Sequence, residues 1–232
     1  MSLESFAAPD DMYRSRGTDV NPQRLLFTGD VYSGVAIAGV QDSGLAIVIE
    51  HPCTMRGTMA QLNDFVLAIS VREHEPMGAN GWKTRCYDLT PLPDLTGTQL
   101  YVGDFLKVGR ASTSELSSKP RLACASEFGI NLLQQRLVWH MTRCLIPTST
   151  ISEAFSHLFE EADLCEDWTD TLFEVGINEV EARQSFDAFL TADLGNGRTL
   201  QKDLSETQLR SAVRAQCRTA AQDIVRARRE GE

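Results

Sequence analysis

The sequence predicts an α+β protein in which a small N-terminal β-barrel is followed by an α-helical C-terminal region. Between residues 25 and 121, short runs rich in β-branched and apolar residues alternate with Gly- and Pro-containing connections, a pattern typical of strands. From Ser126 onward, apolar residues recur every three or four positions, a pattern typical of amphipathic helices. We therefore expect an N-terminal arm over 1–24, a barrel with one C-terminal helix over 25–147, and a helical region over 148–232.

Five segments carry the strand pattern, and turn sequences separate them. Gln41-Asp42-Ser43-Gly44 between the first two predicts a hairpin, and Asn80-Gly81 predicts a turn before the fourth. The predicted strands are 31–40, 45–50, 65–71, 82–89 and 100–108. Five short strands with such connections favour a small barrel or a strongly bent sheet.

Capping residues mark the starts of the predicted helices. Ser126 is a candidate N-cap, and Pro147 ends the helix that follows it. Thr150 with Glu153 forms a capping box, as does Ser205 with Gln208. The predicted helices run from 126 to 145, from 150 onward, around 167–175, from 178 to before 194, and from 205 onward.

The charge imbalance of the chain is concentrated in its last third. Residues 148–196 carry twelve acidic side chains and one basic one, a net charge of −11. Residues 197–232 carry five acidic and eight basic side chains, a net charge of +3. The other 147 residues contribute only −2 to the total of −10. An acidic region is therefore followed by a segment of opposite charge.

Three arginines of that last segment share one face of the predicted final helix because they repeat every four residues. We call Arg210, Arg214 and Arg218 the arginine stripe. Such a stripe could contact phosphate, but the helix has no aromatic residue for stacking on bases. We predict instead that the stripe contacts carboxylates between residues 153 and 181, in the same chain or in a neighbouring copy.

The composition is that of a soluble globular protein, with 42% hydrophobic and 23% charged residues. A pI of about 4.9 disfavours non-specific nucleic-acid binding by the whole chain, because phosphate contacts need an excess of Lys and Arg. No run approaches the roughly 18 apolar residues of a membrane span, and the N-terminus lacks the apolar core of a secretory signal. The six cysteines include no C-x-x-C pair. We expect a cytoplasmic protein with reduced thiols and no cofactor.

Residues 25–147 resemble a known fold in the order of their elements. Gly29-Asp30 opens the first strand, a later strand ends in His51-Pro52-Cys53-Thr54-Met55-Arg56, and the last strands lead into a helix with the text FGINLLQQRLVWHMTR. This order resembles the SH3-like barrel of the MazF/PemK family, and that of uncharacterised bacterial proteins whose second strand ends in Cys-Asp. The resemblance covers about half of the chain and implies an SH3-like fold.

The same resemblance implies two functions. The MazF/PemK family cleaves RNA with an Arg and a Ser or Thr beside the barrel, which implies catalytic roles for Arg56 and Thr58. The Arg-Pro step usual after the family's first hairpin is absent here, and Cys53-Thr54 stands in place of Cys-Asp. The resemblance to the second group implies a subunit of a bacterial assembly, such as an antiviral defence system.

Possible metal ligands occur at spacings that do not predict a metal site. His51, Cys53, His74 and Cys86 have the nitrogen and sulfur donors that Zn²⁺ prefers, but their spacing is irregular. Cys53 beside a histidine could be a nucleophile, but no motif supplies an oxyanion hole or an orienting acid. We interpret this set as buried thiols and loop histidines.

Asp163, Asp167 and Glu174 occupy positions one, five and twelve of an EF-hand loop. Cys165 stands at position three, which needs a hard oxygen donor, and Trp168 stands at position six, which needs Gly. We therefore predict a solvated acidic face on a helix, with Cys165 and Trp168 directed inward.

Arg136, His140 and Arg143 share one face of the helix that begins at Ser126. This face could bind an anion or an acidic partner helix, or it could pair with carboxylates of the following region. We favour pairing within the protein.

We expect a non-enzymatic interaction or scaffold subunit of a bacterial multi-protein assembly. Its expected partners are other proteins or a second copy of the chain, and not nucleic acid or a membrane. The alternative is a MazF-like endoribonuclease toxin that uses Arg56 and Thr58, or residues near Lys83-Thr84-Arg85. The candidate interaction residues are Arg136, His140, Arg143, Arg210, Arg214 and Arg218.

Overall fold

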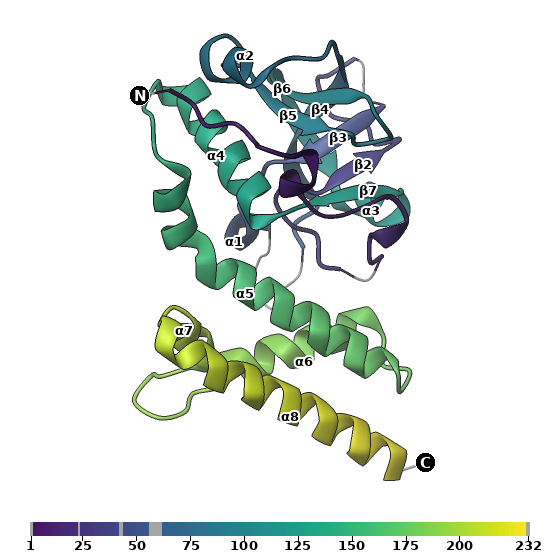
Figure 1. The fold of residues 1–232 in the computed structure, drawn as a ribbon. Coiled ribbons are helices and arrows are strands. Elements are labelled where there is room, and N and C mark those ends of the chain that lie inside the picture. The colour runs from purple at the N-terminus through teal and green to yellow at the C-terminus, as the bar shows by residue number, and fades with distance from the viewer. Residues whose placement is uncertain (1, 23, 42–43, 56–61, 231–232) are drawn as a thin grey trace. The chain divides into compact units, whose positions relative to one another are not determined.

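The computed structural model describes residues 2–22, 24–41, 44–55 and 62–230 (Figure 1). The chain divides into two compact units. The sheet unit comprises 1–22, 26–57 and 62–154, and the helical unit comprises 23–25, 58–61 and 155–232, as far as these residues are described. The predicted α+β class is confirmed, since the strands lie mostly in the N-terminal part and the helices mostly in the C-terminal part.

The described part of the sheet unit holds seven strands and several short helices. The strands are β1 (Tyr13–Arg16), β2 (Val31–Ser33), β3 (Leu45–Val48), β4 (Phe65–His74), β5 (Leu89–Pro93), β6 (Leu100–Ser112) and β7 (Arg121–Ala125). The helices are α1 (Pro52–Met55), α2 (Ala79–Thr84), α3 (Thr113–Ser118) and α4 (Glu127–Thr142), with 3-10 turns η1 (Pro9–Met12) and η2 (Gly17–Asp19).

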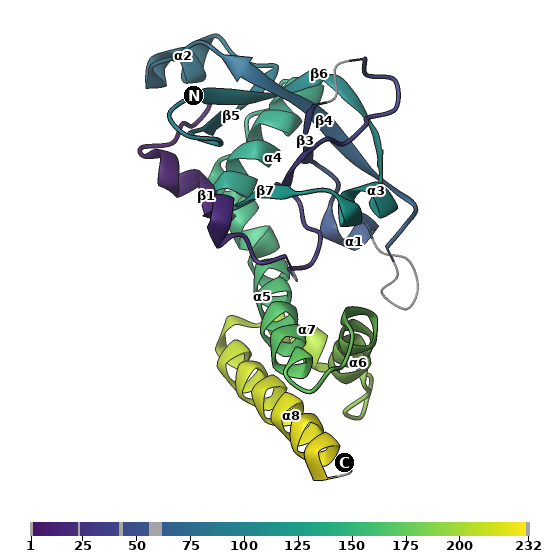
Figure 2. The ribbon, with the colours of Figure 1, turned by 90° about the vertical axis from the view of Figure 1, so that its right-hand side faces the viewer.

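The strands form one curled antiparallel sheet in the order β1-β7-β2-β3-β4-β6-β5. Val31 of β2 pairs with Ile47 of β3, which pairs with Ile69 of β4. These three side chains share one face of the sheet and pack with Leu133 of α4 in a buried cluster. Figures 1 and 2 show α4 lying across this face. The opposite face packs a second buried cluster that includes Val48.

Four predicted strands begin at the residue where an observed strand begins, and the fifth prediction, 82–89, is wrong. Trp82 lies in α2, and β5 begins only at Leu89. The physical reason is that the Trp82 side chain is fully buried and anchors a helical turn, so the Asn80-Gly81 turn continues as a helix. Three of the described strands were not predicted: β5, and β1 and β7, which pair with each other.

The N-terminal arm is ordered against the sheet unit. Leu3 and Met12 are buried, and β1 forms one edge of the sheet. Met12 approaches α4 so closely that a Cβ at Gly129 would lie 2.3 Å from the Met12 carbonyl oxygen. The backbone N–H of Ser126 donates to the same oxygen at 3.0 Å. Glycine at position 129 is therefore what lets the arm lie on α4.

The helical unit is built from four α-helices of the described chain. They are α5 (Thr148–Phe173), α6 (Glu179–Thr191), α7 (Leu200–Leu204) and α8 (Arg210–Glu230), and a 3-10 turn over Thr207–Leu209 precedes the last. The first seven residues of α5 belong to the sheet unit, since the units divide between Ala154 and Phe155. Figures 1 and 2 both show α8 lying alongside α5.

The two helices predicted from 150 and around 167–175 are one continuous helix. Neither Gly nor Pro stands between Pro147 and Gly176, so nothing in the sequence interrupts α5. Its inward face is as predicted: Cys165 and Trp168 are buried. The Trp168 ring packs on Phe186 of α6, with ring centroids 5.7 Å apart. The shared core also includes Leu25, Leu172, Leu190, Leu200, Leu204, Val213, Cys217, Ala221 and Val225.

Candidate functional site

Arg136 is wholly buried in the sheet unit, which corrects its prediction as an exposed interaction residue. Its guanidinium donates to the backbone carbonyls of Glu4 (3.0 Å), Trp82 (2.9 Å), Cys86 (3.0 Å) and Leu89 (3.2 Å). Burial lowers its pKa to about 10, so the group stays charged at neutral pH. Arg136 therefore joins the arm, α2 and β5 to α4.

The other two residues predicted on that face have different environments. His140 is half-buried, and its ring centroid lies 5.6 Å from that of Phe105. Arg143 is exposed and ends α4 in the left-handed region, with a φ of 61°. Since Arg136 is buried, the three side chains do not form one binding surface.

Glu4 of the arm accepts hydrogen bonds from Gln135, which precedes Arg136 in α4, and from Thr148. One carboxylate oxygen accepts hydrogen bonds from the Thr148 backbone N–H (2.9 Å) and from Gln135 Nε2 (3.0 Å), and the other accepts from Thr148 Oγ1 (2.6 Å). Burial opposes ionisation of Glu4, but these hydrogen bonds outweigh it and lower the pKa of the carboxyl below its ordinary value. The arm is thus fastened to the first turn of α5.

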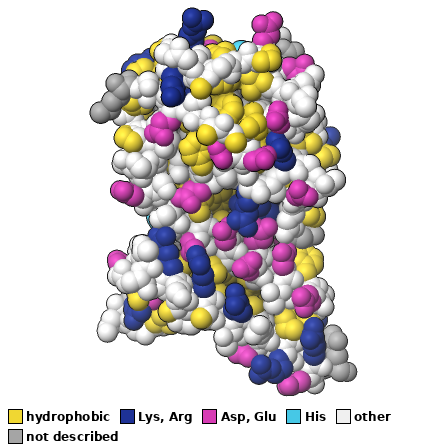
Figure 3. Space-filling view, in the orientation of Figure 1, with side chains coloured by type: hydrophobic (Ala, Val, Ile, Leu, Met, Phe, Trp, Pro, Cys, Tyr) yellow, Lys and Arg dark blue, Asp and Glu magenta, His cyan; other side chains and the backbone are white. Residues whose placement is uncertain are grey.

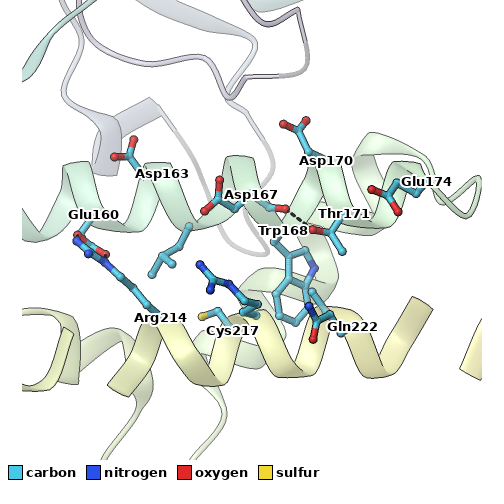
Figure 4. Close-up of a pocket in the computed structure, with 13 residues that line it drawn as sticks. Glu160, Asp163, Asp167, Trp168, Asp170, Thr171, Glu174, Arg214, Cys217 and Gln222 are labelled. Carbon is cyan, nitrogen blue, oxygen red and sulfur yellow. Dashed lines mark hydrogen bonds and ion pairs between the residues drawn. The ribbon is translucent and has the colours of Figure 1, made fainter. Parts of the chain in front are cut away.

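The arginine stripe lies in the helical unit beside a groove between α5 and α8, which we call the α5/α8 groove (Figure 4). Its volume is about 680 Å³. Charged side chains line it: the carboxylates of Glu160, Asp163, Asp167, Asp170 and Glu174, and the guanidinium groups of Arg214 and Arg218. Leu164, Trp168, Cys217 and Ala221 give it an apolar floor. The lining therefore combines a net charge of −3 with buried apolar surface.

The predicted contact between the stripe and the acidic helix is confirmed for Arg214. Its Nε and Nη2 atoms donate to the two carboxylate oxygens of Glu160, a bidentate pair. The Glu160 side chain is 9% exposed, whereas that of Arg214 is 58% exposed. Hydrogen bonds to Glu160, its charge, and the charges of Asp163 and Asp167 raise the pKa of Arg214.

The other two arginines of the stripe differ from Arg214. Arg210 donates to neutral groups, the carbonyl oxygen of Leu204 (2.8 Å) and the hydroxyl of Ser156 (2.9 Å), which corrects its predicted contact with a carboxylate. Arg218 is exposed and lines the groove. In the space-filling view, basic side chains recur along α8, with acidic ones on the neighbouring part of α5 (Figure 3).

Two carboxylates of the groove also face cations outside it. Asp163 lies 3.8 Å from Arg24, and Glu174 lies 3.7 Å from Arg229. Figure 4 shows Asp163 and Asp170 directed away from α8, and Glu160 directed toward it. The acidic surface therefore extends from the side of the groove that faces α8 to its outer rim.

The EF-hand-like spacing lies on a helix, as predicted, since Asp163 and Asp167 are within α5. Sequence reasoning did not single out Glu160, because one acidic residue among twelve carries no distinguishing signal. Glu160 lies seven residues before Asp167 and fourteen before Glu174. This spacing indicates that the three carboxylates share one helix face, and it is the signal that could have identified Glu160.

The remaining candidates do not assemble a site in the described chain. Arg56 and Thr58 lie outside the described residues, as does the side chain of Cys53. His74 Nδ1 lies 2.7 Å from the Glu75 carbonyl oxygen, and the buried Cys86 thiol lies 3.4 Å from a methionine sulfur. No three His, Cys, Asp or Glu residues gather as metal ligands in the part of the chain that the structure describes.

None of the described helices combines the length and the apolar composition needed to span a bilayer. Comparison with known proteins gives no family: no family model matches the chain, and no curated protein matches it either.

Proposed function

We propose that this protein is a cytoplasmic interaction module, a scaffold subunit of a bacterial multi-protein assembly that holds a protein partner through its helical unit. The observation that supports this most is the α5/α8 groove, in which five carboxylates and two guanidinium groups surround an apolar floor. Protein interfaces combine an apolar centre with a charged rim in this way. The rim charges then select the partner and its rate of association.

The chemistry of the groove supports binding over catalysis. Its one thiol, Cys217, sits at the floor, where burial raises its pKa to about 11. A thiol with such a pKa is protonated at neutral pH and is a poor nucleophile. In the contact between Arg214 and Glu160, both carboxylate oxygens of Glu160 accept a hydrogen bond from Arg214.

The curled sheet supports a scaffold role for the sheet unit. Its edge strand β5 contains Pro91 and Pro93, which lack the N–H groups that a further strand would need. We propose an SH3-like barrel for this sheet, on the basis of the curl of its seven described antiparallel strands.

The test is affinity purification of the tagged full-length protein from its own cells, followed by native mass spectrometry. We expect a protein partner at a fixed ratio to this chain. An assay with single-stranded RNA runs beside it. If the purified protein cleaves RNA and Arg56→Ala abolishes the cleavage, while no partner is held at a fixed ratio, the interaction function is wrong and the endoribonuclease is right.

A further inference from the structure

The charge and the size of the α5/α8 groove restrict what it can hold. The groove lining has a net charge of −3, so an occupant with positive charge is favoured. Its volume of about 680 Å³ falls within the range of roughly 300–1,000 Å³ typical of pockets for small ligands. A short segment of chain fits such a volume, whereas a folded surface does not.

The carboxylates lie in two rows along α5. One row is Glu160, Asp167 and Glu174, and the other is Asp163 and Asp170, each with a spacing of seven residues. A helix rises about 1.5 Å per residue, so neighbours within a row are about 10 Å apart. The second row lies over the outer rim of the groove, since Asp163 and Asp170 are directed away from α8 (Figure 4).

The middle of the groove carries a solvent-exposed carboxylate. At one end Glu160 is bound by Arg214, and at the other Glu174 lies 3.7 Å from Arg229. Between them, Asp167 is exposed on the groove side of α5, and Trp168 beside it is buried at the floor. A cation at Asp167 would thus lie next to apolar surface.

We propose that the α5/α8 groove binds a short, extended basic segment of the partner protein, in which Lys or Arg alternates with apolar residues. This inference rests on the interaction function proposed above and names the chemistry of the partner. In an extended chain, alternate side chains point to opposite sides, and those on one side repeat about every 6.6–6.8 Å. The basic side chains then face the carboxylates of α5, while the apolar ones cover Leu164 and Trp168.

The long side chains of Lys and Arg suit this geometry for a second reason. Their aliphatic stems lie on apolar surface while the charged ends reach polar groups. The stem of a basic residue can therefore contact Trp168 while its cation reaches Asp167. Because these charges are partly open to solvent, binding weakens as salt is added.

The test uses fluorescein-labelled synthetic peptides and fluorescence anisotropy with the full chain. The first peptide alternates Lys with Leu, the second has Glu in place of each Lys, and the third has the composition of the first with its lysines in one block. We expect the alternating Lys peptide to bind, the block peptide to bind more weakly, and the Glu peptide not to bind. Added salt should weaken the binding of the Lys peptide.

The groove is tested with Asp167→Lys, and Glu75→Lys serves as the matched control. Both residues are exposed and both changes alter the net charge equally, but Glu75 lies in the sheet unit. We expect Asp167→Lys to raise the Kd of the Lys peptide at least about tenfold, equivalent to about 1.4 kcal/mol, and Glu75→Lys to leave it unchanged. Circular dichroism shows whether each variant is folded.

Three outcomes would overturn the inference: equal binding of the Lys and Glu peptides, equal binding to wild type and Asp167→Lys, or no binding of the Lys peptide. If the co-purified partner stays bound to the Asp167→Lys variant, the partner is held elsewhere, and the interaction function stands without this groove. If no partner co-purifies but the Lys peptide binds through Asp167, the groove chemistry stands and the interaction function fails.

Discussion

Two arginines, one in each unit, show two different uses of the same side chain. Arg136 of the sheet unit is fully buried and donates to four backbone carbonyls, whereas Arg214 of the helical unit is 58% exposed and pairs with Glu160. A buried guanidinium with carbonyl acceptors joins segments of backbone that are far apart in the sequence. An exposed guanidinium in an ion pair contributes little to stability and leaves its surroundings open to a partner. The first arginine organises the fold, and the second borders a candidate site.

The largest expected effect in this comparison is that of Arg136→Met. The substitution keeps much of the buried volume but leaves four carbonyls without their donor, and each unsatisfied buried group costs about 1–3 kcal/mol. We expect the free energy of unfolding, measured with urea, to fall by at least about 3 kcal/mol. Arg143→Met, at an exposed position that ends the same helix, is the control and should change stability by about 0.5 kcal/mol or less. Similar stabilities of the two variants would contradict this role of Arg136.

A smaller effect is expected at Glu4, which fastens the arm beside Arg136. In the wild type, Thr148 and Gln135 donate to the charged carboxylate of Glu4, and Glu4→Gln replaces it with a neutral acceptor. Because hydrogen bonds to a neutral group are weaker, we expect the free energy of unfolding to fall by about 1 kcal/mol at neutral pH. The pKa of Glu4 is lower in the folded than in the unfolded protein, so its ionised form stabilises the fold above the ordinary value of 4.5. That contribution is lost as the pH falls through the folded pKa.

Urea unfolding of wild type and Glu4→Gln, measured from neutral to acidic pH, checks the direction in which the contribution of Glu4 to stability changes with pH. The stability difference between the two proteins should be largest near neutral pH and should shrink as the pH is lowered below 4.5. A difference that stays constant down to acidic pH would show that the charge of Glu4 is not what holds the arm.

The same comparison shows how far the sequence predicts the structure. The spacing of Arg136, His140 and Arg143 indicates which side chains share a helix face, but not what covers that face. Arg136 is covered by the arm and by α2, which are more than fifty residues away from it in the chain. The sequence predicted a strand from Trp82, where α2 lies. Periodicity is local, whereas burial in the sheet unit depends on long-range packing.

Prediction was better in the helical unit because its contacts join neighbouring helices. The excess of carboxylates on one predicted helix and of arginines on another was enough to predict their contact, which Arg214 and Glu160 confirm. The partner of Arg210 was not predictable in the same way, since a hydroxyl and a carbonyl carry no charge pattern. The groove itself depends on how α5 and α8 pack, and the sequence gives no sign of its volume.

A further test of the helical unit is Arg214→Ala, which should have a modest effect. The substitution removes the donor of an exposed ion pair, and such pairs contribute about 0–1 kcal/mol. The loss should lie at the upper end of that range because the Glu160 side chain is only 9% exposed and would keep its charge near buried surface. Urea unfolding at low and high salt measures it. A loss as large as that of Arg136→Met would contradict the contrast between the two arginines.

The smallest effect on stability is expected for Arg218→Ala, and this variant separates folding from binding most sharply. Arg218 is exposed and lines the groove, so its removal should change the free energy of unfolding by about 0.5 kcal/mol or less. The same change makes the net charge of the groove lining −4 in place of −3. Binding of the alternating Lys peptide should therefore become tighter, opposite in direction to Asp167→Lys. Weaker binding of that peptide by the Arg218→Ala variant, measured by anisotropy at low salt, would contradict the electrostatic attraction on which the inference rests.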